Sequence, residues 1–161
     1  MKVSRRSETP EDEPFLRRLI IETVTQELSA WAWPLPMRDH LLGIQYQSRR
    51  AGVKTQFPDG SSQIILANGE DAGWLFIADL ADHIRIIEIM VSPGYRGKGL
   101  GSAILREILA AADNVRKPVR LSVNAMNNGA VRLYQRLGFR HVSSDEVQHQ
   151  MEWTPLLSSF G

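Results

Sequence analysis

A glycine-rich stretch in the middle of the chain carries the residue types that bind phosphate. It reads Val91-Ser-Pro-Gly-Tyr-Arg-Gly-Lys-Gly-Leu-Gly-Ser102, and it joins an apolar run to a helical pattern. Glycine leaves no side chain between the backbone and a ligand, and the N–H groups at the beginning of a helix carry partial positive charge. Arg96 and Lys98 add formal charge. The stretch therefore predicts a loop that binds a phosphate or pyrophosphate.

Two common nucleotide-binding motifs are excluded by single positions in this loop. A P-loop requires lysine directly after its second glycine, but Leu100 follows Gly99. A dinucleotide fingerprint that begins at Gly97 requires glycine where Ser102 stands, and one that begins at Gly99 requires glycine where Ile104 stands. The loop therefore predicts another class of phosphate ligand.

Hydrophobic periodicity and turn residues predict the elements that hold this loop. Apolar residues at helical spacing predict helices at about 9–28, 37–50, 99–112 and 128–137. Strand-like runs lie at about 2–7, 63–67, 74–79, 84–91, 119–123, 139–142 and 147–153. The order β-α-α-β-β-β-α-β-α-β-β predicts an α/β (α+β) fold in which a mixed sheet has helices on both faces.

Length and composition limit the classes of protein that this chain can represent. A chain of 161 residues is the size of one domain, which we expect at 1–153 with a C-terminal tail at 154–161. The net charge of +1 does not favour a nucleic-acid or membrane partner. No stretch predicts a signal peptide or a membrane span, and we expect a cytoplasmic protein. The lack of cysteine excludes a cysteine nucleophile, and the four histidines lack metal-ligand spacing, so no metal is expected.

Two motifs lie on consecutive strand–helix units. The first is Arg96-x-x-Gly99-x-Gly101, between a strand and a helix. The second is Asn127-x-x-Ala130-x-x-Leu133-Tyr134-x-x-x-Gly138-Phe139, on the following strand–helix unit. Together they resemble the motifs of the GCN5-related N-acetyltransferase (GNAT) family, and the order of elements agrees with that family over nearly all of residues 2–153. The resemblance implies a mostly antiparallel sheet whose central strands, 84–91 and 119–123, splay apart to admit an acyl-CoA.

The resemblance also implies which residues bind acetyl-CoA, the cosubstrate of this family. Backbone groups of Ile89, Met90 and Val91 would bond the pantetheine arm as an added half-strand does. The residues that would surround the pyrophosphate are Arg96, Gly97, Lys98, Gly99, Leu100, Gly101 and Ser102. Asn127 would bond the pantetheine or the adenine side, and Tyr134 would lie at the reacting end.

Such enzymes pass the acetyl group directly to a primary amine in a ternary complex, which requires an acid and a base. Tyr134 stands where the family usually has the tyrosine that protonates the departing thiolate, and a phenol is protonated at neutral pH. Glu88, inside an apolar run, is the candidate base, with Asp79, Asp82 and His83 as rivals. Some members of this family that act on protein N-termini carry glutamate at the position of Ser122, so serine there disfavours that subclass.

Each of these residues also has a structural interpretation. The loop could be an ordinary tight turn, Tyr134 a core side chain, and Asn127 an N-cap. Glu88 could bind the amine of the acceptor or pair with Arg85.

Several functional alternatives remain open from the sequence. The chain could bind acyl-CoA as a sensor without transfer, or use a different acyl donor if there is room near Met90 and Val123. The acceptor could be an amino acid, a polyamine, an aminoglycoside, another small amine or a lysine of a peptide or protein. The strand 147–153 is a candidate edge for a homodimer.

Overall fold

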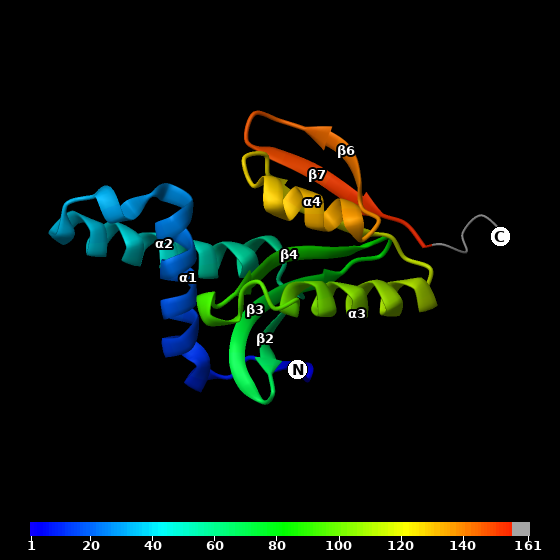
Figure 1. Cartoon of the computed structure of the whole chain (residues 1–161), viewed down its shortest axis with the longest axis horizontal. Coiled ribbons are helices and arrows are strands. Elements are labelled where there is room, and N and C mark those ends of the chain that lie inside the picture. The colour runs from blue at the N-terminus through cyan, green and yellow to red at the C-terminus, as the bar shows by residue number, and fades with distance from the viewer. Residues whose placement is uncertain (156–161) are drawn as a thin grey trace.

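The computed structural model describes residues 1–155, which form one seven-stranded sheet flanked by helices (Figure 1). The strands are β1 Val3–Ser7, β2 Ser61–Ala67, β3 Glu70–Asp79, β4 Ile84–Val91, β5 Val119–Asn124, β6 Arg140–Ser144 and β7 Gln148–Trp153. The α-helices are α1 Glu13–Leu28, α2 Leu35–Gln56, α3 Leu100–Asn114 and α4 Asn128–Arg136. The strand order is β1-β2-β3-β4-β5-β7-β6. The predicted mixed, mostly antiparallel α/β fold is confirmed, while most of the tail expected at 154–161 lies outside the described residues.

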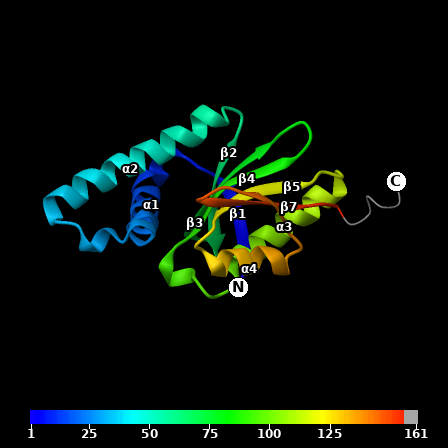
Figure 2. The same cartoon turned by 90° about the horizontal axis from the view of Figure 1, so that it is seen from above.

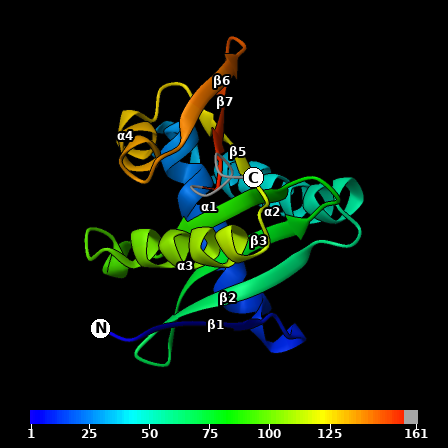
Figure 3. The same cartoon turned by 90° about the vertical axis from the view of Figure 1, so that its right-hand side faces the viewer.

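Helices cover both faces of the sheet, and each face has its own apolar core. Figure 3 shows α3 in front of the sheet and α1 behind it. α3 buries Ile104, Leu105 and Ile108 in one core, and α1 buries Leu16 and Ile20 in the other. Both sets recur at helical spacing, so each helix presents one apolar stripe to the strands. α1 and α2 also project together beyond the strands (Figure 2).

α2 is the helix whose bounds differ most from the prediction of 37–50. It runs over Leu35–Gln56 because Pro36 lies in its first turn, where the missing N–H costs no hydrogen bond. Near its other end Val53 is buried in the core between α1, α2 and the sheet. This tertiary packing extends the helix by more than a turn and brings Gln56 and Phe57 beside β4.

The last hairpin corrects the prediction that strand 147–153 is an edge. β7 pairs with β5 on one side and with β6 on the other. Met151 and Trp153 pack into the core on the α3 side, which fixes β7 inside the sheet. β6 is the edge at this end, and all of its residues are exposed. At this end of the sheet, the edge that could pair with another copy is therefore β6.

The central strands β4 and β5 separate after a short parallel ladder. Ile84, Arg85 and Ile86 pair with Val119, Arg120 and Leu121. Beyond these pairs β4 continues to pair with β3 alone, and β5 with β7 alone, within the described sheet. The predicted splaying is confirmed, and it leaves a gap between residues 87–91 and 122–124.

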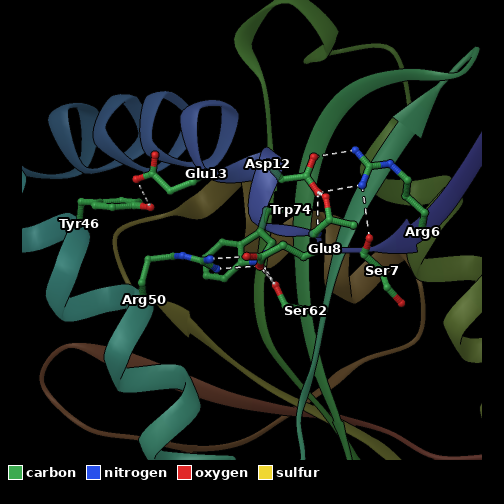
Figure 4. A network of polar contacts seen from close by, with 10 residues as sticks. Arg6, Ser7, Glu8, Asp12, Glu13, Tyr46, Arg50, Ser62 and Trp74 are labelled. Atoms are coloured by element: carbon green, nitrogen blue, oxygen red, sulfur yellow. Dashed lines mark hydrogen bonds and ion pairs between the residues drawn. The ribbon is translucent and has the colours of Figure 1, made fainter.

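A network of charged side chains ties the N-terminal segment to α2 and the sheet (Figure 4). Arg6 donates two hydrogen bonds to Asp12, at 2.8 and 2.7 Å. Glu8 accepts from both Arg50 and Ser62. We call these five residues the N-terminal polar network. It joins β1, β2 and α2 with opposite charges in contact.

Candidate active site

A β-bulge in β4 decides which side chains face α1 and α2. Two consecutive residues of β3 pair with Ile86 and with Glu88, so Ile87 is an extra residue in β4. The bulge shifts the alternation of faces by one position. Glu88 therefore lies on the same face as Arg85 and Met90, the face that packs against α1 and α2. Without the bulge, Glu88 would point into the core under α3.

Glu88 forms a forked ion pair with Arg49 of α2. Its two carboxylate oxygens accept from Nε and Nη2 of Arg49 at 2.8 and 3.0 Å. Nη1 of Arg49 also donates to Glu27 of α1 at 3.0 Å. The pair fixes the orientation of Glu88 and compensates its charge, while lone pairs of its oxygens still face the cleft. This differs from the predicted pairing with Arg85, because Arg85 turns toward β5.

Arg49 is a site residue that the sequence reasoning missed. A signal was present, because Leu42, Tyr46 and Val53 form the buried stripe of α2, and Arg49 lies one turn after Tyr46. A charged side chain beside a buried stripe requires a partner on the element that it faces. That rule would have indicated a carboxylate on the sheet opposite α2.

Tyr134 of α4 combines a core ring with a hydroxyl that faces a cleft. Its side chain is largely buried, and its ring packs edge-on against Phe139 with centroids 5.6 Å apart. Within residues 1–155 its hydroxyl has no hydrogen-bond partner. Burial and, less strongly, the charge of Glu88 raise the pKa of Tyr134 to about 12. The phenol therefore keeps its proton at neutral pH.

Glu88 and Tyr134 line one cleft in the gap between β4 and β5. The cleft has a volume of about 460 Å³, within the range of small-ligand sites. Arg49 and Asn127 also line it. It continues into a hollow bordered by Val91 and Arg96, at the glycine loop. The structure thus brings the predicted acid, the predicted base and the loop to one gap.

The glycine loop adopts a conformation that requires glycine at two positions. Gly97 and Gly99 have φ angles of 75° and 79°, in the left-handed region. Gly99 is the N-cap of α3, so the N–H groups of Leu100, Gly101 and Ser102 have no acceptors inside the helix. A Cβ at Gly97 or Gly99 would meet no atom within 4 Å, so the space before the loop is open. These N–H groups are suited to bind an anion.

The two basic residues of the loop also contact the protein itself. Arg96 donates to the carbonyl of Val91 and to the side chain of Gln26, each at 2.9 Å. Nζ of Lys98 lies 5.8 Å from the centroid of the Tyr95 ring. Arg96 therefore joins the end of β4 to α1 and stabilises the shape of the loop.

The backbone of β4 faces the gap at alternate residues. Ser92 donates its N–H to the carbonyl of Ala72 on β3 at 2.8 Å, and the alternation of a strand turns Met90 toward β3 as well. Ile89 and Val91 therefore direct their backbone groups into the gap. Consecutive residues of a strand face opposite neighbours, so Ile89 and Val91 are better placed for backbone pairing, while a role of Met90, which lines the hollow, stays a prediction.

Asn127 has the capping role that the sequence suggested. Its side-chain oxygen accepts from the N–H of Ala130 at 3.1 Å, at the beginning of α4. It also borders the cleft, across the gap from β4. The cap fixes the Asn127 side chain beside the gap.

The predicted rivals of Glu88 lie outside the cleft. Asp79 and Asp82 lie at the turn between β3 and β4, where they pair with Lys117 and His83. None of the three predicted rivals, His83 included, lines the cleft.

Over residues 1–155 no group of histidine and acidic side chains could hold a metal ion. No helix of that part is long and apolar enough to cross a membrane.

Comparison with known proteins identifies the family. A family model described as an acetyltransferase (GNAT) domain matches residues 43–158. The streptothricin acetyltransferase of Streptomyces lavendulae is 33% identical over 101 residues, which are 57% of this chain and 52% of that protein. The thialysine N-ε-acetyltransferase of Sus scrofa is 36% identical over 72 residues, which are 44% of this chain and 42% of that protein. The chain thus spans about half or less of the length of these curated relatives.

A solved structure has the same fold over its whole length. The PaiA N-acetyltransferase of Thermoplasma acidophilum, crystallised with coenzyme A, superposes with a TM-score of 0.71. The alignment covers 96% of this chain and 99% of that chain, at 18% sequence identity. With the family match over residues 43–158, the conclusion is that this chain belongs to the GNAT family of acetyltransferases.

Proposed function

We propose that this protein transfers the acetyl group of acetyl-CoA to the primary amine of a small molecule. The observation that carries the proposal is the gap between β4 and β5, where Glu88 and Tyr134 line one cleft. The adjoining hollow reaches Arg96 of the glycine loop, and the N–H groups that follow at the beginning of α3 have no acceptors inside the helix. An acid, a base and an anion site along one opening are what acyl transfer from a phosphate-bearing thioester requires.

The donor would lie along β4. Its pyrophosphate would accept hydrogen bonds from the N–H groups of Leu100, Gly101 and Ser102. Its pantetheine arm would pair with the backbone of Ile89 and Val91, in place of the neighbour that β4 lacks there. This placement brings the thioester to the part of the cleft that Glu88 and Tyr134 line.

The transfer forms a bond between the amine nitrogen and the acetyl carbonyl carbon, and it breaks the bond between that carbon and sulfur. The amine gives up a proton, which Glu88 accepts through a water molecule because Arg49 already binds both of its oxygens. The departing sulfur takes the hydroxyl proton of Tyr134. The N–H of Ile89, the gap-facing residue of β4 that lines this cleft, polarises the carbonyl. The chain has no cysteine to carry the acetyl group, so donor and acceptor would bind together.

The names of relatives support a small acceptor. One relative is named for streptothricin, and another for the ε-nitrogen of thialysine. Serine at 122 separates this chain from relatives that carry glutamate there. The hydroxyl of Ser122 accepts a hydrogen bond from Arg85 at 2.8 Å and donates one to Gln150 at 2.7 Å. We therefore place a small-molecule amine in the cleft.

The first experiment is calorimetric titration of acetyl-CoA into the wild type and into Gly99→Glu. The substitution places a negative charge where the pyrophosphate should lie, and we expect micromolar binding in the wild type and a loss of at least about 100-fold in the variant. Gly99→Ala shows the effect of the positive φ angle alone. Gly52→Glu adds the same charge on α2, where a Cβ meets no atom within 4 Å.

A wild type that is folded but does not bind acetyl-CoA would disprove the proposal. Binding without thiol release on addition of any primary amine would instead favour the non-catalytic sensor. Thiol release should be measured over a panel of amines at saturating acetyl-CoA.

A further inference from the structure

Arg85 lies on the cleft face of β4 with part of its guanidinium unused. Its only hydrogen bonds in residues 1–155 come from Nη2, which donates to Ser122 at 2.8 Å and to Gln150 at 3.3 Å. A guanidinium has five N–H donors. Those on Nε and Nη1 of Arg85 have no partners in the described structure. Neither nitrogen is fully buried. Among the described residues, the only fully buried side-chain nitrogen or oxygen without a hydrogen-bond partner is Nε of Arg38. Arg85 lines a groove beside the cleft.

The carboxylates near Arg85 belong to other arginines. Glu88 pairs with Arg49, and Glu152 of β7 pairs with Arg120 of β5 at 2.6 Å. Among the described residues no ion pair joins Arg85 to a carboxylate. Burial and, secondarily, the charge of Arg120 lower the pKa of Arg85. A half-buried positive charge without a counter-charge is unfavourable, and an anionic ligand would relieve it.

A groove connects Arg85 to the reacting end of the cleft. Gln148 and Gln150 of β7 line it together with Arg85, and Phe57, after the end of α2, also lines it. Ile87 and Ser122 border both this groove and the cleft of Glu88 and Tyr134. One molecule can therefore contact Arg85 at one end and approach Glu88 at the other.

The spacing along β4 sets the size of such a molecule. The bulge places Arg85 and Glu88 on one face, and three steps along a strand span about 10 Å. The α-amine and the carboxylate of an amino acid are attached to the same carbon. An acceptor that reacts through its α-amine is therefore too short to span that distance. A chain of about the length of a lysine side chain brings an anion to Arg85 and an amine to Glu88.

We propose that Arg85, with Gln148 and Gln150, binds a carboxylate of the acceptor, and that the acceptor is an ω-amino carboxylate of about lysine length. The carboxylate accepts from Nε and Nη1 of Arg85, and the two glutamine amides donate from β7. This inference rests on the proposed transfer of an acetyl group to an amine. It adds a specificity-determining residue that lies away from the acid and the base.

The wild type alone tests the inference with matched acceptors at saturating acetyl-CoA. ε-Aminocaproate, its uncharged amide and hexamethylenediamine share similar chain lengths and differ in the far group. We expect kcat/KM for ε-aminocaproate to exceed that for the amide about tenfold to a hundredfold, mainly through KM. β-Alanine, with a shorter chain, should be a poor acceptor.

Substitutions at Arg85 test whether that residue is the cause. Arg85→Gln should remove the preference for the carboxylate while leaving kcat/KM for the amide within about threefold. Arg85→Glu should reverse the preference toward hexamethylenediamine, a change that a merely structural role does not produce. Arg140→Gln, on the exposed strand β6, is the matched control and should leave every ratio unchanged.

The outcomes separate this inference from the proposed function. Equal rates with the carboxylate and the amide in the wild type would overturn the Arg85 site, yet acetyl transfer would stand. An equal loss for all acceptors in Arg85→Gln would overturn the carboxylate site and show that Arg85 only joins β4 to β5 and β7. Acetyl-CoA affinity is measured in each variant, and its absence in the folded wild type would remove both proposals.

Discussion

Arg49 and Arg50 are consecutive residues of α2 that enter two different kinds of polar site. Arg50 pairs with Glu8 inside the N-terminal polar network (Figure 4). Arg49 pairs with Glu88 at the cleft. Successive helical residues point about 100° apart, so a single helix contributes one arginine to each site. The two sites can be compared because they have similar pairs and different surroundings.

The difference lies in what each site leaves unpaired. In the N-terminal polar network each charged side chain meets an opposite charge, and Ser62 also accepts from the indole of Trp74 at 2.8 Å. At the cleft the hydroxyl of Tyr134 has no partner within the described residues, and neither do two nitrogens of Arg85 in the adjoining groove. A network that is complete stabilises the fold. A site with free donors beside a cavity is ready to bind a ligand.

The largest effect is expected from the free hydroxyl of the cleft. Tyr134→Phe removes the proton donor and should lower kcat by about 100-fold to 1,000-fold, because no other described side chain in the cleft is a protonated acid. The free energy of unfolding should change by less than about 1 kcal/mol, since the hydroxyl has no partner to lose. Steady-state kinetics and urea unfolding measure the two quantities.

Tyr46→Phe is the matched control for this substitution. Its hydroxyl donates to Glu13 at 2.9 Å near the N-terminal polar network. The control should lose about 1 kcal/mol of stability and keep its kcat. A Tyr134→Phe enzyme with wild-type kcat would remove Tyr134 from the mechanism.

The next effect concerns the arginine of the complete network. Arg50→Met leaves Glu8 without its partner, and both side chains of that pair are largely buried. We expect a loss of about 3 kcal/mol in the free energy of unfolding. The affinity for acetyl-CoA should not change, because the network lies away from the gap. If the free energy of unfolding of Arg50→Met equals that of the wild type, the ion pair of Arg50 and Glu8 contributes no net stabilisation.

Local features of the site could be predicted from the sequence, whereas its placement in the fold could not. Gly97 and Gly99 are required by a backbone conformation that depends on a few neighbouring residues. The N-cap at Asn127 is equally local. The bulge that turns Glu88 toward Arg49 depends instead on pairing with β3, which no pattern in β4 indicates.

The errors have the same origin. The position of β7 inside the sheet depends on how the last hairpin packs, and either of its strands could have paired with β5. Tertiary packing also extends α2 beyond its sequence pattern. Contacts between elements therefore determine the strand order and the helix bounds that hydrophobic periodicity alone does not specify.

A smaller effect is expected from the arginine at the cleft. Arg49→Gln leaves Glu88 without its fork, so the carboxylate loses its fixed orientation. We expect kcat/KM for the amine to fall about tenfold, and the free energy of unfolding to fall by about 1 kcal/mol or less, because Glu88 gains access to water in the cleft. Arg49→Lys keeps the charge and should recover part of the activity. Unchanged kinetics in Arg49→Gln would assign the pair to packing alone.

The smallest effect is a pH dependence of the N-terminal polar network. The hydrogen bonds from Arg6, with that from the N–H of Thr9, hold the pKa of the Asp12 carboxyl at about 2, below its ordinary value. A carboxyl with a depressed pKa in the folded state stabilises the protein above its unfolded pKa, and this contribution is lost as the pH falls from about 4 to about 2. Arg6 is more than one-third exposed, so solvent screening limits the contribution to about 1 kcal/mol. Unfolding of the wild type and of Asp12→Asn should therefore differ by about that amount at pH 7 and converge near pH 2. A difference that stays constant over this range would show that Asp12 acts as a hydrogen-bond acceptor regardless of its charge.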